Sequence, residues 1–280
     1  VLGVVFVDAN NGTVVDSVHL AASALDRRVC NDDNLWVNSG SCPVPTRVEG
    51  DGPSSDDQVD DIYDQLGAVY DYYADRYGRD SVDDAGLQLV GVARGCFEVD
   101  DCPMFGAYWE PNNLSMVFGD GWAVDDVTGH ELTHGVIQFT SGLVSENEPG
   151  AINEALADIF GEFIDQTNGI GDDGDDERWL IAEEAPGGAL RDMEDPTESP
   201  DIEQPDRYRS PLWYTGTEDS GGIHINSGVA NKAAYLMTDG DSFNGYTIDG
   251  IGEEKVGHVF YEANTALLTS TSNYRDLYNC

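Results

Sequence analysis

The residues best suited to chemistry in this chain are two histidines and a glutamate, in the sequence His130-Glu131-Leu132-Thr133-His134. Positions i and i+4 of a helix share one face, so His130 and His134 can direct their imidazoles to one metal ion. Two such histidines with a third protein ligand leave one zinc position for water, as in catalytic zinc sites. Zinc lowers the pKa of that water to roughly 7. The motif therefore predicts a zinc-activated water with Glu131 as its general base.

A second segment offers the third ligand. Glu154 and Asp158 are also i and i+4, on a predicted helix whose apolar stripe is formed by Leu156, Ile159, Phe160 and Phe163. One of the two carboxylates can bind the metal, while the other accepts the free ring N–H of a ligand histidine. Asn153 can make a similar bond. The alternatives are a chance His-Glu-x-x-His match and a solvated acidic face.

The elements that must position these residues follow from periodicity. Residues 57–78 and 125–140 read as amphipathic helices, and the second has an apolar back of Val127, Leu132, Val136 and Ile137. Helices are also expected at 229–237 and 253–268. Strands and loops fill residues 1–56, and an acidic stretch containing prolines extends from residue 166 to about 211. The fold class is therefore α+β.

Six segments occur in an order typical of one family: 70–73, 107–109, 118–121, 129–135, 150–158 and 221–228. Over roughly residues 57–280 the chain resembles the thermolysin-type zinc metalloendopeptidases, in which a distant glutamate completes the HExxH motif. The resemblance implies two lobes, a mixed β/α N-terminal lobe and a mainly helical C-terminal lobe, with zinc in the cleft. It makes Glu154 the third zinc ligand, and Asp158 and Asn153 the residues that orient the ligand histidines.

The same resemblance implies roles at the opposite side of the cleft. His224 would stabilise the transition-state oxyanion, and Asp219 would hold its ring and favour the protonated form. Arg191 would bind a substrate carbonyl, and Ala107 and Tyr108 would contact the substrate. Judged from the residues alone, His224 could be an ordinary surface histidine and Arg191 a surface salt-bridge partner.

Three departures from the family pattern affect the pocket. Ser145 stands where the family has a tyrosine that helps to hold the oxyanion, and its shorter hydroxyl reaches less far, which leaves Tyr108 or Tyr214 as candidate substitutes. Gly106 replaces an asparagine that binds the substrate backbone. The loop before the zinc helix is also short. We therefore expect an altered specificity pocket, with Trp122 among its lining residues.

Composition describes the setting of the protein. The chain has 280 residues, 40% of them hydrophobic, and 54 acidic against 13 basic residues give a formal charge of −41. This charge argues against binding to nucleic acid or to an anionic membrane. It is typical either of a protein kept soluble in high salt or of acidic clusters neutralised by calcium. We expect a monomer.

Calcium is expected beside the zinc helices. Hard cations prefer six to eight oxygen ligands, which acidic loops provide. Asp126, Asp165 and Glu183 match the family positions for such a site. The acidic run at 172–177 lies where the family supplies further ligands, although the spacing in this chain differs. Other acidic residues are expected to be solvated.

The five cysteines suggest disulfides. Cys30 and Cys42 flank one short loop, and Cys96 and Cys102 flank another, which favours local bridges and an oxidising, extracellular setting. Cys280 is left over at the last position. In the family a helical stretch follows this point, so we expect its partner to lie beyond residue 280.

Residues 4–15 alternate in polarity and contain Asn11-Gly12, a hairpin pattern. They lack the features of a signal peptide. The hairpin resembles the last strands of the family propeptide, with processing between residues 20 and 30 and Arg27-Arg28 as one candidate site. The alternative is a first hairpin of the catalytic lobe. We expect a propeptide end at 1–25, an N-terminal catalytic lobe at 26–140 and a helical lobe at 141–280.

The sequence as a whole predicts a secreted zinc endopeptidase that acts on peptide or protein substrates and binds its own propeptide. Two alternatives remain on the same fold. One is a catalytically weakened, calcium-stabilised binding module. The other is an immature zymogen fragment that is inactive when isolated.

Overall fold

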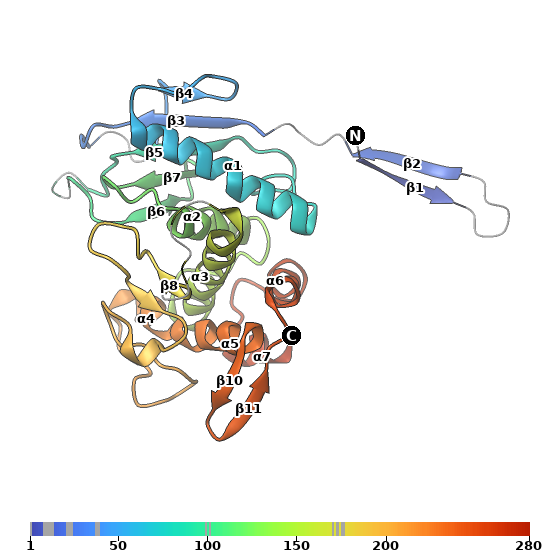
Figure 1. Cartoon of the computed structure of the whole chain (residues 1–280), viewed down its shortest axis with the longest axis vertical. Helices are drawn as coiled ribbons and strands as arrows, with labels where there is room; N and C mark the ends of the chain where they lie inside the picture. Colours follow the sequence, from blue (N-terminus) through green and yellow to red (C-terminus); the bar gives the residue numbers. More distant parts are fainter. Residues whose placement is uncertain are drawn as a thin grey trace.

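The structure is a computed structural model. It describes residues 25–36, 40–98, 100, 102–169, 171, 174 and 177–280, together with the backbone of 2–7 and 14–20. The predicted Asn11-Gly12 turn, the segment 21–24 and most of the acidic run at 172–177 lie outside the described residues. Strands β1 (Leu2–Val7) and β2 (Val14–Leu20) pair antiparallel, as the hairpin prediction requires, in a two-stranded sheet of their own (Figure 1).

The N-terminal lobe is built on a five-stranded sheet of order β4-β3-β5-β7-β6. Its strands are β3 (Arg27–Asn31), β4 (Arg47–Val48), β5 (Leu89–Ala93), β6 (Ala107–Glu110) and β7 (Ser115–Phe118). The three central strands run parallel, and β4 and β6 pair antiparallel at the edges. All four residues of β7 are buried, as expected for a strand covered on both faces. Edge strand β6 faces the site described below.

Helix α1 (Asp57–Tyr77) covers one face of this sheet (Figure 1). Its N-cap, Asp56, accepts a hydrogen bond from the Val59 backbone N–H, and the helix ends at Gly78, whose φ of 70° is readily adopted by glycine. Close approach to the sheet depends on Gly91 in β5, where an added Cβ would lie 2.4 Å from the Ile62 side chain. The helix predicted at 57–78 is thus confirmed nearly to the residue.

Helices α2 (Asp125–Gln138) and α3 (Asn147–Asn168) cross between the two lobes and carry the HExxH motif and its partner segment. They approach closely at two glycines. A Cβ added to Gly129 would lie 3.0 Å from the Gly161 Cα, and one added to Gly161 would lie 2.6 Å from the Asp126 carbonyl oxygen. Any larger side chain at either glycine would push the helices apart.

The C-terminal lobe is mainly helical, which confirms the two-lobed α+β prediction (Figure 1). Its elements are β8 (Leu180–Ile181), β9 (Arg191–Asp192), a 3₁₀ turn (Pro196–Glu198), α4 (Asp219–Asn226), α5 (Gly228–Thr238), β10 (Gly240–Phe243), β11 (Tyr246–Asp249), α6 (Glu253–Glu262) and α7 (Tyr274–Asn279). The helix expected at 253–268 changes to a π-helical turn at Ala263–Leu267. Among the described residues, no helix has the length and apolarity needed to cross a bilayer.

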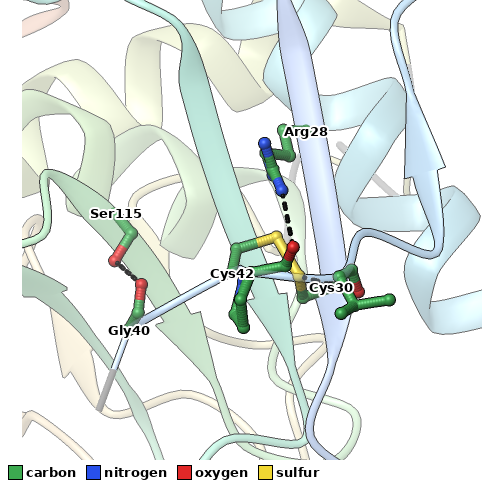
Figure 2. The surroundings of a disulfide bond; sticks show 7 residues. Arg28, Cys30, Gly40, Cys42 and Ser115 are labelled. Carbon is green, nitrogen blue, oxygen red and sulfur yellow. Dashed lines mark hydrogen bonds between the residues drawn. A yellow bond between two sulfur atoms is a disulfide. The ribbon is translucent and has the colours of Figure 1, made fainter. Parts of the chain in front are cut away.

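Both predicted disulfides are present. Cys30–Cys42 joins the end of β3 to the following loop, and Cys96–Cys102 closes the short loop before β6. Figure 2 shows two hydrogen bonds beside the first bridge: Arg28 donates to the Pro43 carbonyl (3.1 Å), and the Ser115 hydroxyl donates to the Gly40 carbonyl (2.8 Å). The bridge and these bonds fasten Gly40, Cys42 and Pro43 to the sheet. Cys280 is an exposed free thiol.

Arg27 is fixed at the start of β3. Its guanidinium donates to Glu49 at 2.7 and 2.9 Å and to the Tyr63 carbonyl at 3.0 Å, and it stacks 3.7 Å over the Tyr63 ring. Arg47 stacks at the same distance on that ring. Cleavage at Arg27-Arg28 would require β3 to leave the sheet, so the structure argues against this pair as the processing site. The predicted boundary at residue 25 stays a prediction.

Candidate active site and metal centre

The three predicted zinc ligands converge at the crossing of α2 and α3. The Nε2 atoms of His130 and His134 lie 3.0 Å apart, and the Glu154 Oε2 lies 3.4 Å from the first and 3.8 Å from the second. In the part of the chain that the structure describes, this is the only group of three metal-binding side chains whose ligand atoms all lie within 4.8 Å of one another. The two helices thus bring together residues from the two sequence segments.

The hydrogen bonds around the trio fit a cation. His130 donates through Nδ1 to Asp158 (2.9 Å). His134 donates through Nδ1 to the Asn153 Oδ1 (2.8 Å), whose orientation is fixed because the Asn153 amide donates to the Leu143 carbonyl. In the neutral rings, both Nε2 atoms therefore present lone pairs to each other and to the Glu154 Oε2, which is buried and accepts no hydrogen bond from the described residues. Zinc prefers nitrogen and oxygen ligands of this kind.

The charges in this buried trio depend on one another. Burial disfavours the charged form of His130, but the hydrogen bond to Asp158 and the nearby Glu154 carboxylate outweigh burial and raise the pKa of His130 to about 10. Burial likewise opposes ionisation of Glu154, but attraction to His224 and His134 keeps its pKa well below the usual value. The Glu154 carboxylate is thus ionised and needs positive charge beside it. A bound divalent cation would supply that charge.

Glu131 lies beside the trio and borders both of the hollows that open onto it. Its side chain is buried, and burial raises its pKa despite the opposing attraction of His130 and His134. A raised pKa brings a carboxylate closer to the value at which it exchanges protons efficiently near neutral pH. This position suits a general base.

His224 approaches from α4 on the other side of the cleft. Its Nε2 lies 3.4 Å from the Glu154 Oε2, and its Nδ1 lies 2.6 Å from the Asp219 Oδ1. Attraction to Glu154, followed by the bond to Asp219, raises the pKa of His224 although burial opposes it. The turn that carries the ring uses positive φ at Asp219 (50°), Ser220 (49°), Gly221 (93°) and Gly222 (81°).

Arg191 and Asp158 form a buried ion pair behind the metal centre. Arg191 donates through Nε at 2.8 Å and through Nη2 at 2.5 Å to the two carboxylate oxygens. Burial opposes ionisation of Asp158, but the charges of Arg191 and His130 hold its pKa well below the usual range. Arg191 therefore both neutralises the carboxylate that orients His130 and borders the cleft.

Two hollows of about 560 Å³ each meet at His130, Glu131, His224 and Ala107. The first is bordered by Trp109, Gln138, Val144 and Ser145, and the second by Phe105, Trp122, Arg191 and Ile202. A peptide crossing the metal centre could place side chains in both. A larger apolar hollow, of about 950 Å³ among α5, α6 and α7, contains none of the predicted site residues.

Two tyrosine predictions need correction. Tyr108 lies on the face of β6 opposite Ala107, where its ring packs edge-on against Phe97 at 5.2 Å and its hydroxyl donates to the Cys96 carbonyl. The Tyr214 hydroxyl accepts the Glu218 backbone N–H at 3.2 Å. Among the described residues that border the two hollows neither tyrosine occurs, so neither replaces the hydroxyl absent at Ser145.

Trp109 and Phe105 border the two hollows, and the sequence interpretation missed both. Trp109 shares the face of Ala107 because strand side chains alternate, and its indole donates to Gln138 at 2.7 Å. Phe105 packs edge-on against Trp122, with ring centroids 4.6 Å apart, and remains 67% exposed. The period of two could have identified Trp109. Nothing in the sequence indicated Phe105.

The predicted calcium residues share one buried region without forming a tight ligand set. Asp126 accepts backbone N–H groups of Val127 and Ala182. Burial, followed by repulsion from Asp125 and Asp126, raises the pKa of Asp165, and burial with repulsion from Asp126 raises that of Glu183. Nearby cationic charge would relieve this crowding of carboxylates.

Comparisons with known proteins agree with this geometry. The family model described as the thermolysin metallopeptidase catalytic domain matches residues 4–138, and the model of its alpha-helical domain matches residues 141–280. The chain is 40% identical to a zinc metalloproteinase of Renibacterium salmoninarum over 276 residues, which is 91% of this chain and 49% of the relative. It is 40% identical to a bacillolysin of Bacillus cereus over 225 residues, 76% of this chain and 37% of the relative.

Among solved structures, the precursor of protealysin, a metalloproteinase from Serratia proteamaculans, superposes with a TM-score of 0.72 at 30% identity. The match covers 93% of this chain and 82% of that one. The chain spans about half or less of the length of these curated relatives. Because the two family models together cover nearly the whole sequence, the chain belongs to the thermolysin metallopeptidase family.

Proposed function

We propose that the protein is a zinc-dependent endopeptidase. The observation that carries this proposal is the convergence of two histidine lone pairs and an unpaired carboxylate oxygen, with Glu131 beside them at the meeting of two hollows. His130, His134 and Glu154 would hold zinc. When bound, zinc would supply Lewis-acid chemistry that polarises a water and a peptide carbonyl.

The chain's own residues would carry the proton transfers. Glu131 would accept a proton from the attacking water and pass it to the leaving amine. Protonated His224 would donate a hydrogen bond through Nε2 to the oxyanion, because Asp219 holds the proton on the other ring nitrogen. Asp158 and Asn153 would keep the ligand histidines in the tautomer that leaves Nε2 unprotonated.

Substrate contacts would come from both hollows. Ala107 and Trp109 lie on the face of β6 that borders the cleft, and Arg191 reaches it from the other side. The apolar border formed by Phe105, Trp122 and Ile202 favours an apolar substrate side chain in the second hollow. A small residue at Ser145 leaves the first hollow wider than a tyrosine would.

Calcium, secretion and a propeptide belong to the same proposal. The crowded carboxylates of Asp126, Asp165 and Glu183 suggest a calcium-stabilised region. The two disulfides suit an oxidising, extracellular setting. The hairpin of β1 and β2 would be the end of a propeptide, in keeping with the precursor among its structural neighbours. We expect the protein to act as a monomer.

The decisive experiment replaces the proposed base. Glu131→Gln keeps the shape of the side chain, so zinc should still bind while hydrolysis of casein or a quenched peptide falls about 10²–10⁴-fold. Glu146→Gln, an exposed glutamate at the start of α3, is the matched control and should leave turnover unchanged. o-Phenanthroline should abolish activity and added zinc should restore it. Wild-type protein that binds zinc without any turnover would overturn the proposal and favour a binding module.

A further inference from the structure

We infer that Asn231 is a positioning residue for zinc, which acts through Asp158 on the ring of His130. The inference rests on the proposed zinc site and adds a residue from a third helix to it. Asn231 lies on α5 in the C-terminal lobe, whereas Asp158 is on α3 and His130 on α2. One side-chain relay thus runs from α5 to a proposed metal ligand.

The Asp158 carboxylate receives four donated hydrogen bonds. Its Oδ1 accepts from the His130 Nδ1 (2.9 Å) and from the Arg191 Nη2 (2.5 Å). Its Oδ2 accepts from the Arg191 Nε (2.8 Å) and from the Asn231 Nδ2 (2.8 Å). Each oxygen therefore has two donors, and the plane of the carboxylate is fixed from three sides.

Asn231 directs its side-chain N–H to Asp158 on α3 and not to its own helix. The side chain is fully buried, and its Oδ1 has no hydrogen-bond partner among the described residues. Burying an amide with an unpaired carbonyl costs free energy, and an apolar residue of similar size would avoid that cost. The hydrogen bond that the Asn231 Nδ2 donates to Asp158 offsets part of this cost.

Loss of this bond would act on the metal through geometry. Without Asn231, the carboxylate keeps the two bonds from Arg191 and the bond to His130 but loses one of the two donors to Oδ2, so it turns more easily about its Cβ–Cγ bond. Because the bond from His130 to Oδ1 fixes the direction of the imidazole, the Nε2 lone pair would then point less uniformly at the zinc position. Partners outside the ligand set typically change metal affinity about 10–100-fold. Since Asn231 acts one step further away, we expect the lower end of that range.

The test compares two buried asparagines of the C-terminal lobe. Asn231→Leu and Asn231→Ala remove the donor with and without filling its volume, and Asn264→Leu is the matched control. Asn264 is 1% exposed, and its amide accepts a bond from Ser141 rather than from a site residue. Zinc dissociation constants are measured by competition with a chelator on the full chain, and the absorption spectrum of the cobalt-substituted protein reports the ligand geometry.

We expect both Asn231 variants to bind zinc about tenfold more weakly and to change the cobalt spectrum, while Asn264→Leu leaves both unchanged. In a background of Asp158→Asn, adding Asn231→Leu should weaken zinc binding no further. Zinc affinity within twofold of wild type in a folded Asn231 variant would overturn the inference, as would failure of both variants to fold while Asn264→Leu folds. A separate variant, His134→Ala, tests the proposed zinc site. If this variant binds zinc as tightly as wild type, the proposed function is wrong, whatever the result for Asn231.

Discussion

The two carboxylate oxygens of Asp219 bind two different nitrogens of His224. Oδ1 lies 2.6 Å from the ring Nδ1, and Oδ2 accepts the His224 backbone N–H at 2.9 Å. The ring is therefore held in a fixed direction relative to its own backbone. The positive φ of Asp219 and of the three residues after it folds the chain back so that both bonds can form.

This relationship predicts separate effects for the two residues. His224→Ala should lower kcat about 10²–10³-fold with little change in KM, because the lost bond is made to the oxyanion.

Asp219→Asn should have a smaller effect on kcat. Since Asp219 contributes to the raised pKa of His224, it should also move the alkaline limb of the pH–rate profile to lower pH. Asp206→Asn, at a half-buried acid paired with the exposed Arg207, serves as the control. An unmoved alkaline limb would contradict the role given to Asp219.

The contact between α2 and α3 predicts that Gly161→Ala damages the metal site. The new Cβ would lie 2.6 Å from the Asp126 carbonyl, so the helices must separate. Overpacking of this kind costs about 1–3 kcal/mol. Zinc affinity should fall as well, because His130 and Glu154 lie on opposite helices. Gly52→Ala, at an exposed glycine with nothing within 4 Å of the added Cβ, should change neither. Chemical denaturation and chelator competition measure the two effects, and unchanged zinc affinity would show that the helices tolerate the added methyl group.

Glu162 predicts how stability varies with pH. Its side chain is fully buried in α3, and burial raises its pKa from 4.5 to about 8 despite hydrogen bonds from Gln166 and the Trp179 backbone. Between these values the folded protein binds a proton that the unfolded chain has lost. Stability therefore falls as pH rises through this window. Glu162→Gln should flatten the dependence and raise Tm at pH 8 by several degrees, since about 1 kcal/mol corresponds to about 2–4 °C.

Thermal unfolding scans between pH 5 and pH 8, without added calcium, measure this effect. Asp165 and Glu183 are crowded in the same region and should act in the same direction, so added calcium should also flatten the curve. A Tm that is equally sensitive to pH in wild type and Glu162→Gln would show that other groups determine it.

Ser145 predicts a gain of activity. It borders the first hollow beside Val144. The family resemblance implies a tyrosine hydroxyl at this position. Ser145→Tyr should raise kcat/KM on small peptides about tenfold by adding an oxyanion donor. Ser145→Phe is the control, because it adds the ring without the hydroxyl. If the two variants have equal rates, any gain comes from packing of the ring and not from the hydroxyl.

The sequence predicted the parts of the site that depend on local periodicity. His130 and His134 share a helix face, α1 begins and ends close to the expected residues, and each disulfide closes a short loop. Contacts between distant elements were not predictable in this way. The pairing of Asn231 with Asp158, 73 positions apart, depends on how α5 packs against α3.

Two predictions from the sequence, the role of Tyr108 and the helix at 253–268, differ from the structure for reasons that lie in short segments of the chain. Tyr108 was assigned to the substrate although strand alternation places it opposite Ala107 and Trp109. The turn at Ala263–Leu267 follows α6 without a proline or glycine to signal the change. The π-helical hydrogen bonding there is visible only in the structure.

The fixed position of Arg27 has a mechanical consequence for the N-terminal hairpin. A force applied to the chain before Leu25 would first meet Asp26, whose carbonyl accepts the Leu89 backbone N–H. It would then meet Arg27, where the ion pair with Glu49 and the stack on Tyr63 must also break before β3 can shear away from β5. We therefore expect these contacts to resist movement transmitted from the hairpin. A cut upstream of residue 26 would leave Arg27 attached to Tyr63 of α1, so the new chain end would stay fixed to the lobe.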